Sequence, residues 1–181
     1  MKPLSEQVVV ITGASSGIGR ETALHFARHG ARLALVARNR EALDEAASEV
    51  RESGGEALAV PADVSDWNQV QHVAQQAVDR FGRIDTWVNN AAVALYSYFE
   101  DITPQEFKRV IDVNVMGQVH GAMAALPHLK QAGGTLIGIG SALSEIPAPL
   151  QAPYVASKHA LKGFYDTLRL EQEHERTGVQ V

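Results

Sequence analysis

Short apolar runs alternate with longer amphipathic stretches along the whole chain. The apolar runs predict strands at Val8–Ile11, Leu33–Ala37, Ala57–Val60, Thr86–Asn89 and Thr135–Ile139. The stretches between them have helical periodicity and predict helices at Gly17–His29, Asn39–Ser53, Asp66–Phe81, Thr103–Leu129 and Pro153–His174. Gly178–Val181 has the pattern of a sixth strand that is cut off at its start.

Several helix ends carry capping signals. Asn39 and Ser65 precede two of the helices, and we expect their side-chain oxygens to cap them. Thr103 is followed by a proline and then by Glu106, which predicts a capping box. We expect Pro127 to bend the same helix near its end.

The alternation of strand and helix determines the expected fold class. Helices of this length between apolar strands predict right-handed crossovers and a parallel sheet covered on both faces. The strands are short and nearly all apolar, as strands buried on both faces are. We therefore predict an α/β protein with a Rossmann-type doubly wound parallel sheet, in one domain that spans residues 1–181.

The segment Thr12–Gly19, Thr-Gly-Ala-Ser-Ser-Gly-Ile-Gly, directly follows the first predicted strand and opens the first helix. Glycine permits the tight turn and lets a phosphate approach the backbone. The helix that follows offers unpaired N–H groups and the positive end of its dipole to an anion. A glycine motif between a strand and a helix is typical of a site for a dinucleotide pyrophosphate.

The residue after the second strand bears on which dinucleotide is bound. In a doubly wound sheet the ligand lies at the carboxyl ends of the strands, and NAD-type sites usually have an acid at this position. This chain has Arg38 there, and a guanidinium pairs with a 2′-phosphate that an acid would repel. The sequence therefore favours NADP over NAD. The alternative is that Arg38 is a solvated start of the next helix, with Glu41 nearby.

Polar and aromatic residues follow the third and fourth strands. Asp63 either accepts a hydrogen bond from an adenine amino group or fills a turn, which is the commoner role of Asp after a strand. Asn89 and Asn90 either lie near the ligand or satisfy backbone groups between strands. Three aromatic residues of the next loop either line a substrate pocket or pack the loop: Tyr96, Tyr98 and Phe99.

Tyr154 and Lys158 are four residues apart at the start of the last helix, so they share a helix face. A nearby ammonium favours the phenolate form of a tyrosine and suits it to general acid–base work, although such pairs are also common on helix surfaces. Ser141 follows the fifth strand, where a hydroxyl can reach a substrate oxygen. Asn114 is a poor helix former within a predicted helix, and is either a surface residue or the holder of a water or a kink.

Composition excludes several classes of protein. The 181-residue chain has a formal net charge of −5 and no basic block, so a nucleic-acid partner has no support. It has no cysteine, and His25 and His29 lack a third ligand, so no metal is expected. The absence of a signal-like or membrane-length apolar stretch predicts a cytoplasmic protein with no membrane partner.

Together these motifs resemble those of the classical short-chain dehydrogenases/reductases in order and spacing. The resemblance rests on the glycine turn and on Asp63, Val64, Asn89, Asn90, Ala91, Asn114, Ser141, Tyr154 and Lys158. It implies an NADP-dependent oxidoreductase that transfers a hydride between the nicotinamide and a carbonyl or secondary alcohol substrate. It implies that the cofactor is bound by Gly13, Ser15, Ser16, Gly17, Ile18, Gly19, Arg38, Asp63, Val64, Asn90, Ala91, Tyr154 and Lys158.

The resemblance also implies a role for each of four catalytic residues. Tyr154 would exchange a proton with the substrate oxygen, and Lys158 would bind the nicotinamide ribose and favour the tyrosinate. Ser141 would position the substrate oxygen and stabilise charge on it, and Asn114 would hold a water in a proton relay.

Members of this family continue beyond the point where this chain ends, so we expect a C-terminally truncated form without the substrate-covering segment. The alternatives are an inert fragment or a non-catalytic nucleotide-binding module of the same fold. The family often pairs its two long helices across a subunit interface, which predicts a homodimer or homotetramer. The small side chains expected to permit this approach are Ala122, Ala124, Ala125, Ala156 and Ala160.

Overall fold

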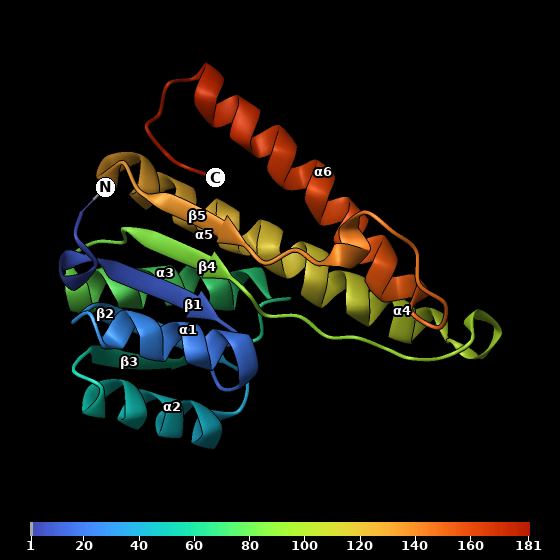
Figure 1. Cartoon of the computed structure of the whole chain (residues 1–181), viewed down its shortest axis with the longest axis horizontal. Helices are drawn as coiled ribbons and strands as arrows, with labels where there is room; N and C mark the ends of the chain where they lie inside the picture. Colours follow the sequence, from blue (N-terminus) through green and yellow to red (C-terminus); the bar gives the residue numbers. More distant parts are fainter. Residues whose placement is uncertain (1) are drawn as a thin grey trace.

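Five parallel strands form one sheet in the order β3-β2-β1-β4-β5 (Figure 1). The structure is a computed structural model and describes residues 2–181. The strands are β1 (Val8–Thr12), β2 (Arg32–Ala37), β3 (Glu56–Pro61), β4 (Thr86–Asn89) and β5 (Thr135–Gly138). The α-helices are α1 (Gly17–Ala27), α2 (Arg40–Glu52), α3 (Trp67–Phe81), α4 (Pro104–Ile111), α5 (Gly117–Ala132) and α6 (Ala152–His174). Short 3₁₀ turns are η1 (Leu4–Glu6), η2 (Phe99–Asp101) and η4 (Ala142–Ser144).

The first strand lies at the centre of the sheet, between β2 and β4. In the observed register, Val10 is opposite Ala34 of β2 and Trp87 of β4. The chain winds outward from β1 first in one direction and then in the other, so the strand order reverses beside β1. This confirms the predicted doubly wound parallel sheet, and ligands of such sheets bind at the reversal point.

The two faces of the sheet are buried under different helices. On one face Val9 and Leu33 pack with residues of α1 and α2, and on the other Val10 and Ala34 pack with residues of α3 and α5. Burying a valine or leucine side chain stabilises a protein by about 1.5–3 kcal/mol. The apolar character of β1 and β2 is therefore a consequence of burial on both faces.

Two of the predicted helix caps are confirmed and one is wrong. Asn39 accepts a hydrogen bond from the amide three residues on, at 3.2 Å, and Thr103 and Glu106 form a capping box. Asp66 caps α3 in place of Ser65, because its carboxylate accepts bonds of 2.9 and 3.2 Å from the amides two and three residues on. A carboxylate is a stronger acceptor than a hydroxyl.

The helix predicted over 103–129 is two helices joined by one π-helical turn, η3 (Asp112–Met116). The interruption therefore lies earlier than Pro127, which is inside α5. Asn114 lies in the π-helical turn and is fully buried, so it is not a surface residue. Single π-helical turns are frequent at functional sites.

The predicted sixth strand is reduced to one residue pair. Gln180 bridges Thr135 in parallel at the outer edge of β5. The amide of Leu136 donates to the Gln180 carbonyl at 2.8 Å, and the Gln180 amide donates to the Gly134 carbonyl at 3.0 Å. The direction of pairing agrees with the prediction, but the sheet described by residues 2–181 has five strands.

Candidate cofactor and catalytic site

The turn between β1 and α1 passes close to the end of β4. Gly13 has a φ of +68°, a conformation that L side chains rarely adopt. A Cβ on Gly13 would lie 2.8 Å from Nδ2 of Asn90, and a Cβ on Gly19 would run into the Gly13 carbonyl oxygen. The turn therefore requires glycine at these two positions. Gly17 also has a positive φ, of +53°, but faces open space.

Thr12 and Asn90 hold this turn against β4. The Thr12 hydroxyl donates to the Val88 carbonyl at 3.3 Å and accepts from the amides of Asn90 and Ala91 at 3.0 and 3.1 Å. The Asn90 side chain donates to the carbonyls of Thr12 and Gly13 at 3.0 and 3.2 Å. Asn90 thus satisfies backbone groups between strands, and it also borders a hollow at the carboxyl ends of the strands.

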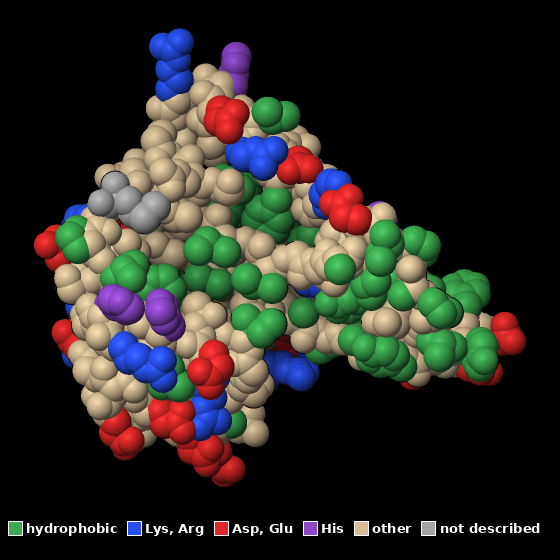
Figure 2. All heavy atoms as spheres, viewed as in Figure 1, with side chains coloured by type: hydrophobic (Ala, Val, Ile, Leu, Met, Phe, Trp, Pro, Cys, Tyr) green, Lys and Arg blue, Asp and Glu red, His purple; other side chains and the backbone are tan. Residues whose placement is uncertain are grey.

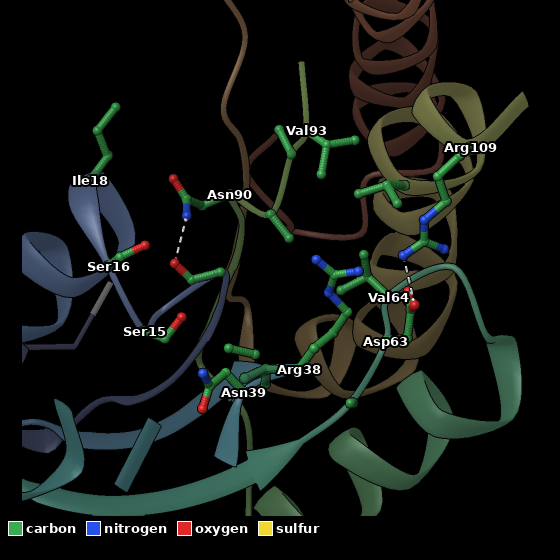
Figure 3. Close-up of a pocket in the computed structure, with 17 residues that line it drawn as sticks. Ser15, Ser16, Ile18, Arg38, Asn39, Asp63, Val64, Asn90, Val93 and Arg109 are labelled. Carbon is green, nitrogen blue, oxygen red and sulfur yellow. Dashed lines mark hydrogen bonds and ion pairs between the residues drawn. The ribbon is translucent and has the colours of Figure 1, made fainter. Parts of the chain in front are cut away.

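A hollow of about 730 Å³ runs along the carboxyl ends of β1, β2, β3 and β4 (Figure 3). Nine of the predicted cofactor residues line it: Gly13, Ser15, Ser16, Ile18, Arg38, Asp63, Val64, Asn90 and Ala91. Four others do not: Gly17, Gly19, Tyr154 and Lys158. The volume lies in the range of cofactor sites, and a Cβ at Gly13 or Gly19 would clash with the turn, so the residues present fit a dinucleotide.

Two arginines border this hollow in different surroundings. Arg38 follows β2, is exposed, and forms no hydrogen bond or ion pair within residues 2–181. Its exposure agrees with a phosphate-binding role and equally with a solvated helix start. Arg109 comes from α4 and is paired with Asp63 at 2.7 Å. Of these two arginines, Arg38 alone has its charge free for an anionic group in the hollow as residues 2–181 form it.

Asp63 lies beyond the end of β3 with partners on both carboxylate oxygens. The amide and hydroxyl of Ser65 donate to Oδ1 at 3.0 and 2.7 Å, and Nη2 of Arg109 donates to Oδ2 at 2.7 Å. Burial acts to raise the pKa of Asp63, but the hydrogen bonds from Ser65 and Arg109 outweigh it and leave the pKa below its usual value. The carboxylate stays ionised and borders the hollow. Its hydrogen bonds with Ser65 also stabilise the turn that follows β3.

Tyr154 and Lys158 lie on one face of α6, as predicted from their spacing. Nζ of Lys158 is 5.5 Å from the centre of the Tyr154 ring and donates to the Ile139 carbonyl at 2.7 Å. Lys158 is 1% exposed, and burial lowers its pKa from the usual 10.5. The amine therefore links the chain just beyond β5 to the tyrosine on α6.

Asn114 connects η3 to the start of α6. Its Nδ2 donates to the Val93 carbonyl at 2.9 Å and to Oγ of Ser157 at 3.0 Å, and its Oδ1 accepts from the Val93 amide at 2.8 Å. Ser157 donates in turn to the Tyr154 carbonyl at 2.7 Å. Both N–H bonds of the Asn114 amide are used, so its side chain braces α6 and has no donor left for a water.

Ser141 lies two residues beyond Ile139 and caps η4, accepting from the Leu143 amide at 3.1 Å. Its hydroxyl hydrogen is not engaged by any group of residues 2–181. Ser141 borders a second hollow, of about 560 Å³, between β5 and α6, where Tyr165 also lies. The other three predicted catalytic residues, Asn114, Tyr154 and Lys158, line neither of these two hollows; Lys158 is bound to the chain just beyond β5 and Asn114 to Ser157 of α6.

The loop after β4 exposes its aromatic side chains. Tyr96, Tyr98 and Phe99 are 70%, 66% and 70% exposed, so they do not pack the loop. The Ser97 amide donates to the Leu150 carbonyl at 3.0 Å and ties this loop to the one before α6. Hydrophobic side chains gather over this projecting end of the molecule (Figure 2).

Two residues of these networks were missed by sequence reasoning. Arg109 lines the hollow, but the sequence around it has only the pattern of an amphipathic helix with a charged, solvent-exposed face. Ser157 is fully buried and donates to the Tyr154 carbonyl, and its position three residues after the tyrosine was the available signal. A serine hydroxyl in a helix often bonds to the carbonyl three or four residues earlier.

Three of the alanines predicted at a subunit interface lie in the core. Ala122, Ala124 and Ala125 are at most 7% exposed and pack in the cluster under the sheet. Ala156 and Ala160 are exposed. The prediction that Ala122, Ala124 and Ala125 lie at a subunit interface was wrong, because the sequence pattern of α5 does not show which of its faces packs against the sheet.

Within residues 2–181, no helix has the length and apolar character needed to cross a membrane. In the same part of the chain, no three His, Asp or Glu side chains are grouped as metal ligands.

Residues 7–181 match the family model described as short chain dehydrogenase. The uncharacterized oxidoreductase YxnA of Bacillus subtilis (strain 168) is 43% identical over 183 residues, which cover 100% of this chain and 51% of that protein. The chain thus spans about half the length of the curated relatives it matches.

Two solved structures are similar over most of the chain. A short chain dehydrogenase/reductase from Burkholderia phymatum, in complex with NAD, has a TM-score of 0.96 and 31% identity, covering 99% of this chain and 65% of that one. An alcohol dehydrogenase from the archaeon Thermococcus sibiricus, complexed with 5-hydroxy-NADP, has a TM-score of 0.88 and 35% identity, covering 91% of this chain and 71% of that one.

Proposed function

The chain belongs to the short-chain dehydrogenase family, and from this premise we propose that it is an NADP-dependent oxidoreductase. Its reaction is hydride transfer between the nicotinamide and a carbonyl or secondary alcohol substrate, with Tyr154 as general acid or base. The similarity to an alcohol dehydrogenase complexed with an NADP analogue supports this class of reaction.

The position of Lys158 is the observation that carries the proposal. Its amine is buried, lies 5.5 Å from the Tyr154 ring centre and is bound to the Ile139 carbonyl. Burying a lysine amine is unfavourable, because desolvation penalises its charged form. A buried lysine beside a half-buried tyrosine therefore supports a chemical role for the pair, since neither contributes to the core as an apolar side chain would.

The hollow along the strand ends supplies the groups that would hold the dinucleotide. The turn at Gly13 and the first amides of α1 would hold the pyrophosphate, because Ser16 makes no side-chain cap that would occupy them. Asp63 would receive the adenine amino group. When bound, the nicotinamide supplies or accepts the hydride.

The charges around the hollow support NADP over NAD. Asp63 is the single acidic residue among those that line it within residues 2–181, and Arg109 already pairs with it. Arg38 is the remaining cation and has no partner. A 2′-phosphate would therefore meet an available guanidinium and no unpaired carboxylate.

Side chains of this chain would exchange the proton and bind the substrate oxygen. The Tyr154 hydroxyl gives its proton to a carbonyl oxygen in reduction, and the Tyr154 phenolate takes a proton from an alcohol in oxidation. Ser141 directs its unengaged hydroxyl hydrogen to the same oxygen. Asn114 acts through Ser157, which holds the first turn of α6 and therefore the tyrosine.

The proposal includes assembly into a homodimer or homotetramer through α4, α5 and α6. Of the small residues predicted there, Ala156 and Ala160 are exposed and remain available for close helix approach. Light scattering tests this part: a dimer or tetramer is expected, and a monodisperse monomer contradicts it.

Replacing Tyr154 by phenylalanine tests the reaction. NADPH oxidation is followed with a panel of ketones and aldehydes, and NADPH binding is measured separately by calorimetry. We expect Tyr154→Phe to lower turnover by about a hundredfold or more, the range of general acid–base catalysis, and to leave binding within about twofold. Turnover that survives the substitution contradicts the mechanism. Binding without turnover in the unsubstituted protein points to the non-catalytic module.

A further inference from the structure

Arg109 reaches the hollow from α4, 46 residues along the chain from the aspartate that it contacts. We propose that Arg109 is a positioning residue for the adenine end of the cofactor: it fixes the Asp63 carboxylate so that this group receives the adenine amino group, and it leaves the 2′-phosphate to Arg38. This inference rests on the proposed function, because it assumes that the hollow holds a dinucleotide.

The guanidinium of Arg109 is anchored at two points. Nη2 donates to Oδ2 of Asp63 at 2.7 Å, and Nη1 donates to Oγ of Ser65 at 2.7 Å. The Ser65 hydroxyl donates in turn to the other carboxylate oxygen, Oδ1, at 2.7 Å. The three side chains form a closed ring of hydrogen bonds that fixes the orientation of the carboxylate.

This ring leaves the carboxylate able to accept a further bond. Each carboxylate oxygen has two lone pairs, and Oδ2 has one protein donor, from Arg109. Figure 3 shows Asp63 and Arg109 on one side of the hollow, with Ser15, Ser16 and Ile18 on the other. A dinucleotide with its pyrophosphate at the glycine turn would therefore extend its adenine toward this pair.

Stability does not account for the pair. The side chains of Arg109 and Asp63 are 39% and 28% exposed, and ion pairs this open to solvent contribute little to folding. Charge does not make Arg109 a phosphate-binding group either, because Asp63 neutralises it, whereas Arg38 lines the same hollow without a partner. The remaining role for Arg109 is to orient the Asp63 carboxylate, which borders the hollow.

The test compares dinucleotides that differ at the base or at the ribose. Dissociation constants for NADH, NADPH and nicotinamide hypoxanthine dinucleotide, in which a carbonyl replaces the adenine amino group, are measured by calorimetry on the 181-residue chain. Arg109→Gln is compared with Arg109→Lys, which keeps the positive charge but cannot donate to Asp63 and Ser65 from two separate nitrogens. Lys108→Gln is the matched control, because it removes a neighbouring α4 cation that pairs with Asp112 and does not line the hollow.

We expect Arg109→Gln to weaken NADH and NADPH binding about tenfold each, the value of one hydrogen bond to a charged group, and to change hypoxanthine dinucleotide binding less than twofold. Arg109→Lys should behave like Arg109→Gln, and Lys108→Gln like the unsubstituted chain. Asp63→Asn should give the same base-dependent loss, with no further loss in the double variant.

Three outcomes overturn the inference. Equal losses for the adenine and hypoxanthine dinucleotides would show that Arg109 does not act through the amino group. A loss confined to NADPH would make Arg109 a phosphate-binding residue, and full rescue by Arg109→Lys would mean that charge alone matters. If Arg109→Gln does not fold, Ser65→Ala removes one anchor of the same ring and must show the base-dependent loss in a weaker form. Failure of the unsubstituted chain to bind any dinucleotide would instead overturn the proposed function.

Discussion

The side-chain amide of Asn114 donates a 3.0 Å hydrogen bond to the hydroxyl of Ser157, 43 residues further along the chain. Ser157 donates onward to the Tyr154 carbonyl at 2.7 Å, so the π-helical turn η3 is bound to the first turn of α6. Asn114 and Ser157 are both fully buried where η3 packs against α6. The backbone of Tyr154 is therefore linked through Ser157 to the π-helical turn.

Ser157→Ala is expected to destabilise the protein and to slow the reaction. Removing the hydroxyl leaves one N–H of the buried Asn114 amide without a partner, which costs about 1–3 kcal/mol. Turnover should fall about tenfold while the NADPH dissociation constant stays within about twofold, because the bridge holds the tyrosine and does not line the cofactor hollow. Urea unfolding and steady-state kinetics measure the two effects. Ser48→Ala, at an exposed position of α2, is the control and should change neither.

Gly19→Ala tests the close approach of α1 to the glycine turn. The added Cβ would run into the Gly13 carbonyl oxygen, so α1 or the turn must shift, and overpacking of this kind costs about 1–3 kcal/mol. We expect NADPH binding to weaken more than tenfold. Gly163→Ala is the matched control, because a Cβ at this exposed position of α6 meets nothing within 4 Å. It should raise stability by about 0.5–1 kcal/mol, and a similar loss of binding in both variants would contradict the account.

Lys158→Met tests the effect of the buried amine on the free energy of unfolding and, separately, on turnover. Burial lowers the pKa of Lys158 from the usual 10.5, so between the lowered value and 10.5 the unfolded chain binds more protons than the folded one. The free energy of unfolding of the unsubstituted protein should therefore rise with pH across this window. In Lys158→Met that rise should be missing and turnover should fall by about a hundredfold or more. The same rise in the variant would assign it to another group.

Arg38→Gln tests the preference for NADP. Loss of a charge-assisted contact to the 2′-phosphate should weaken NADPH binding about ten- to a hundredfold and leave NADH binding within about twofold. Arg40→Gln is the control, because Arg40 pairs with Asp44 at 3.1 Å and is absent from the lining of the hollow. Equal losses for both dinucleotides would mean that Arg38 acts on the fold and not on the phosphate.

The features that the sequence predicted well are encoded locally. The central strands β1 and β2 are short apolar runs because they are buried on both faces, and the turn at Gly13 and Gly19 needs residues without a Cβ. The spacing of Tyr154 and Lys158 places them together because four residues make about one helical turn. These features depend only on residues a few positions apart, so they can be predicted from the sequence.

The features that were missed depend on contacts between distant segments. Arg109 acquires its position from Asp63, 46 residues earlier, and the π-helical turn around Asn114 is stabilised by bonds to Val93 and Ser157. Ala122, Ala124 and Ala125 were expected at a subunit interface but are buried in the core for the same reason. Periodicity identifies an apolar face but does not say what packs against it.

Calorimetric titration of the 181-residue chain with NADPH, and with NADH in parallel, tests whether the hollow along the strand ends binds a dinucleotide. We expect saturable binding of one dinucleotide per chain, with NADPH at least tenfold tighter than NADH because only NADPH can use the free charge of Arg38. Binding of neither dinucleotide by a folded chain would contradict the assignment of the hollow to a cofactor.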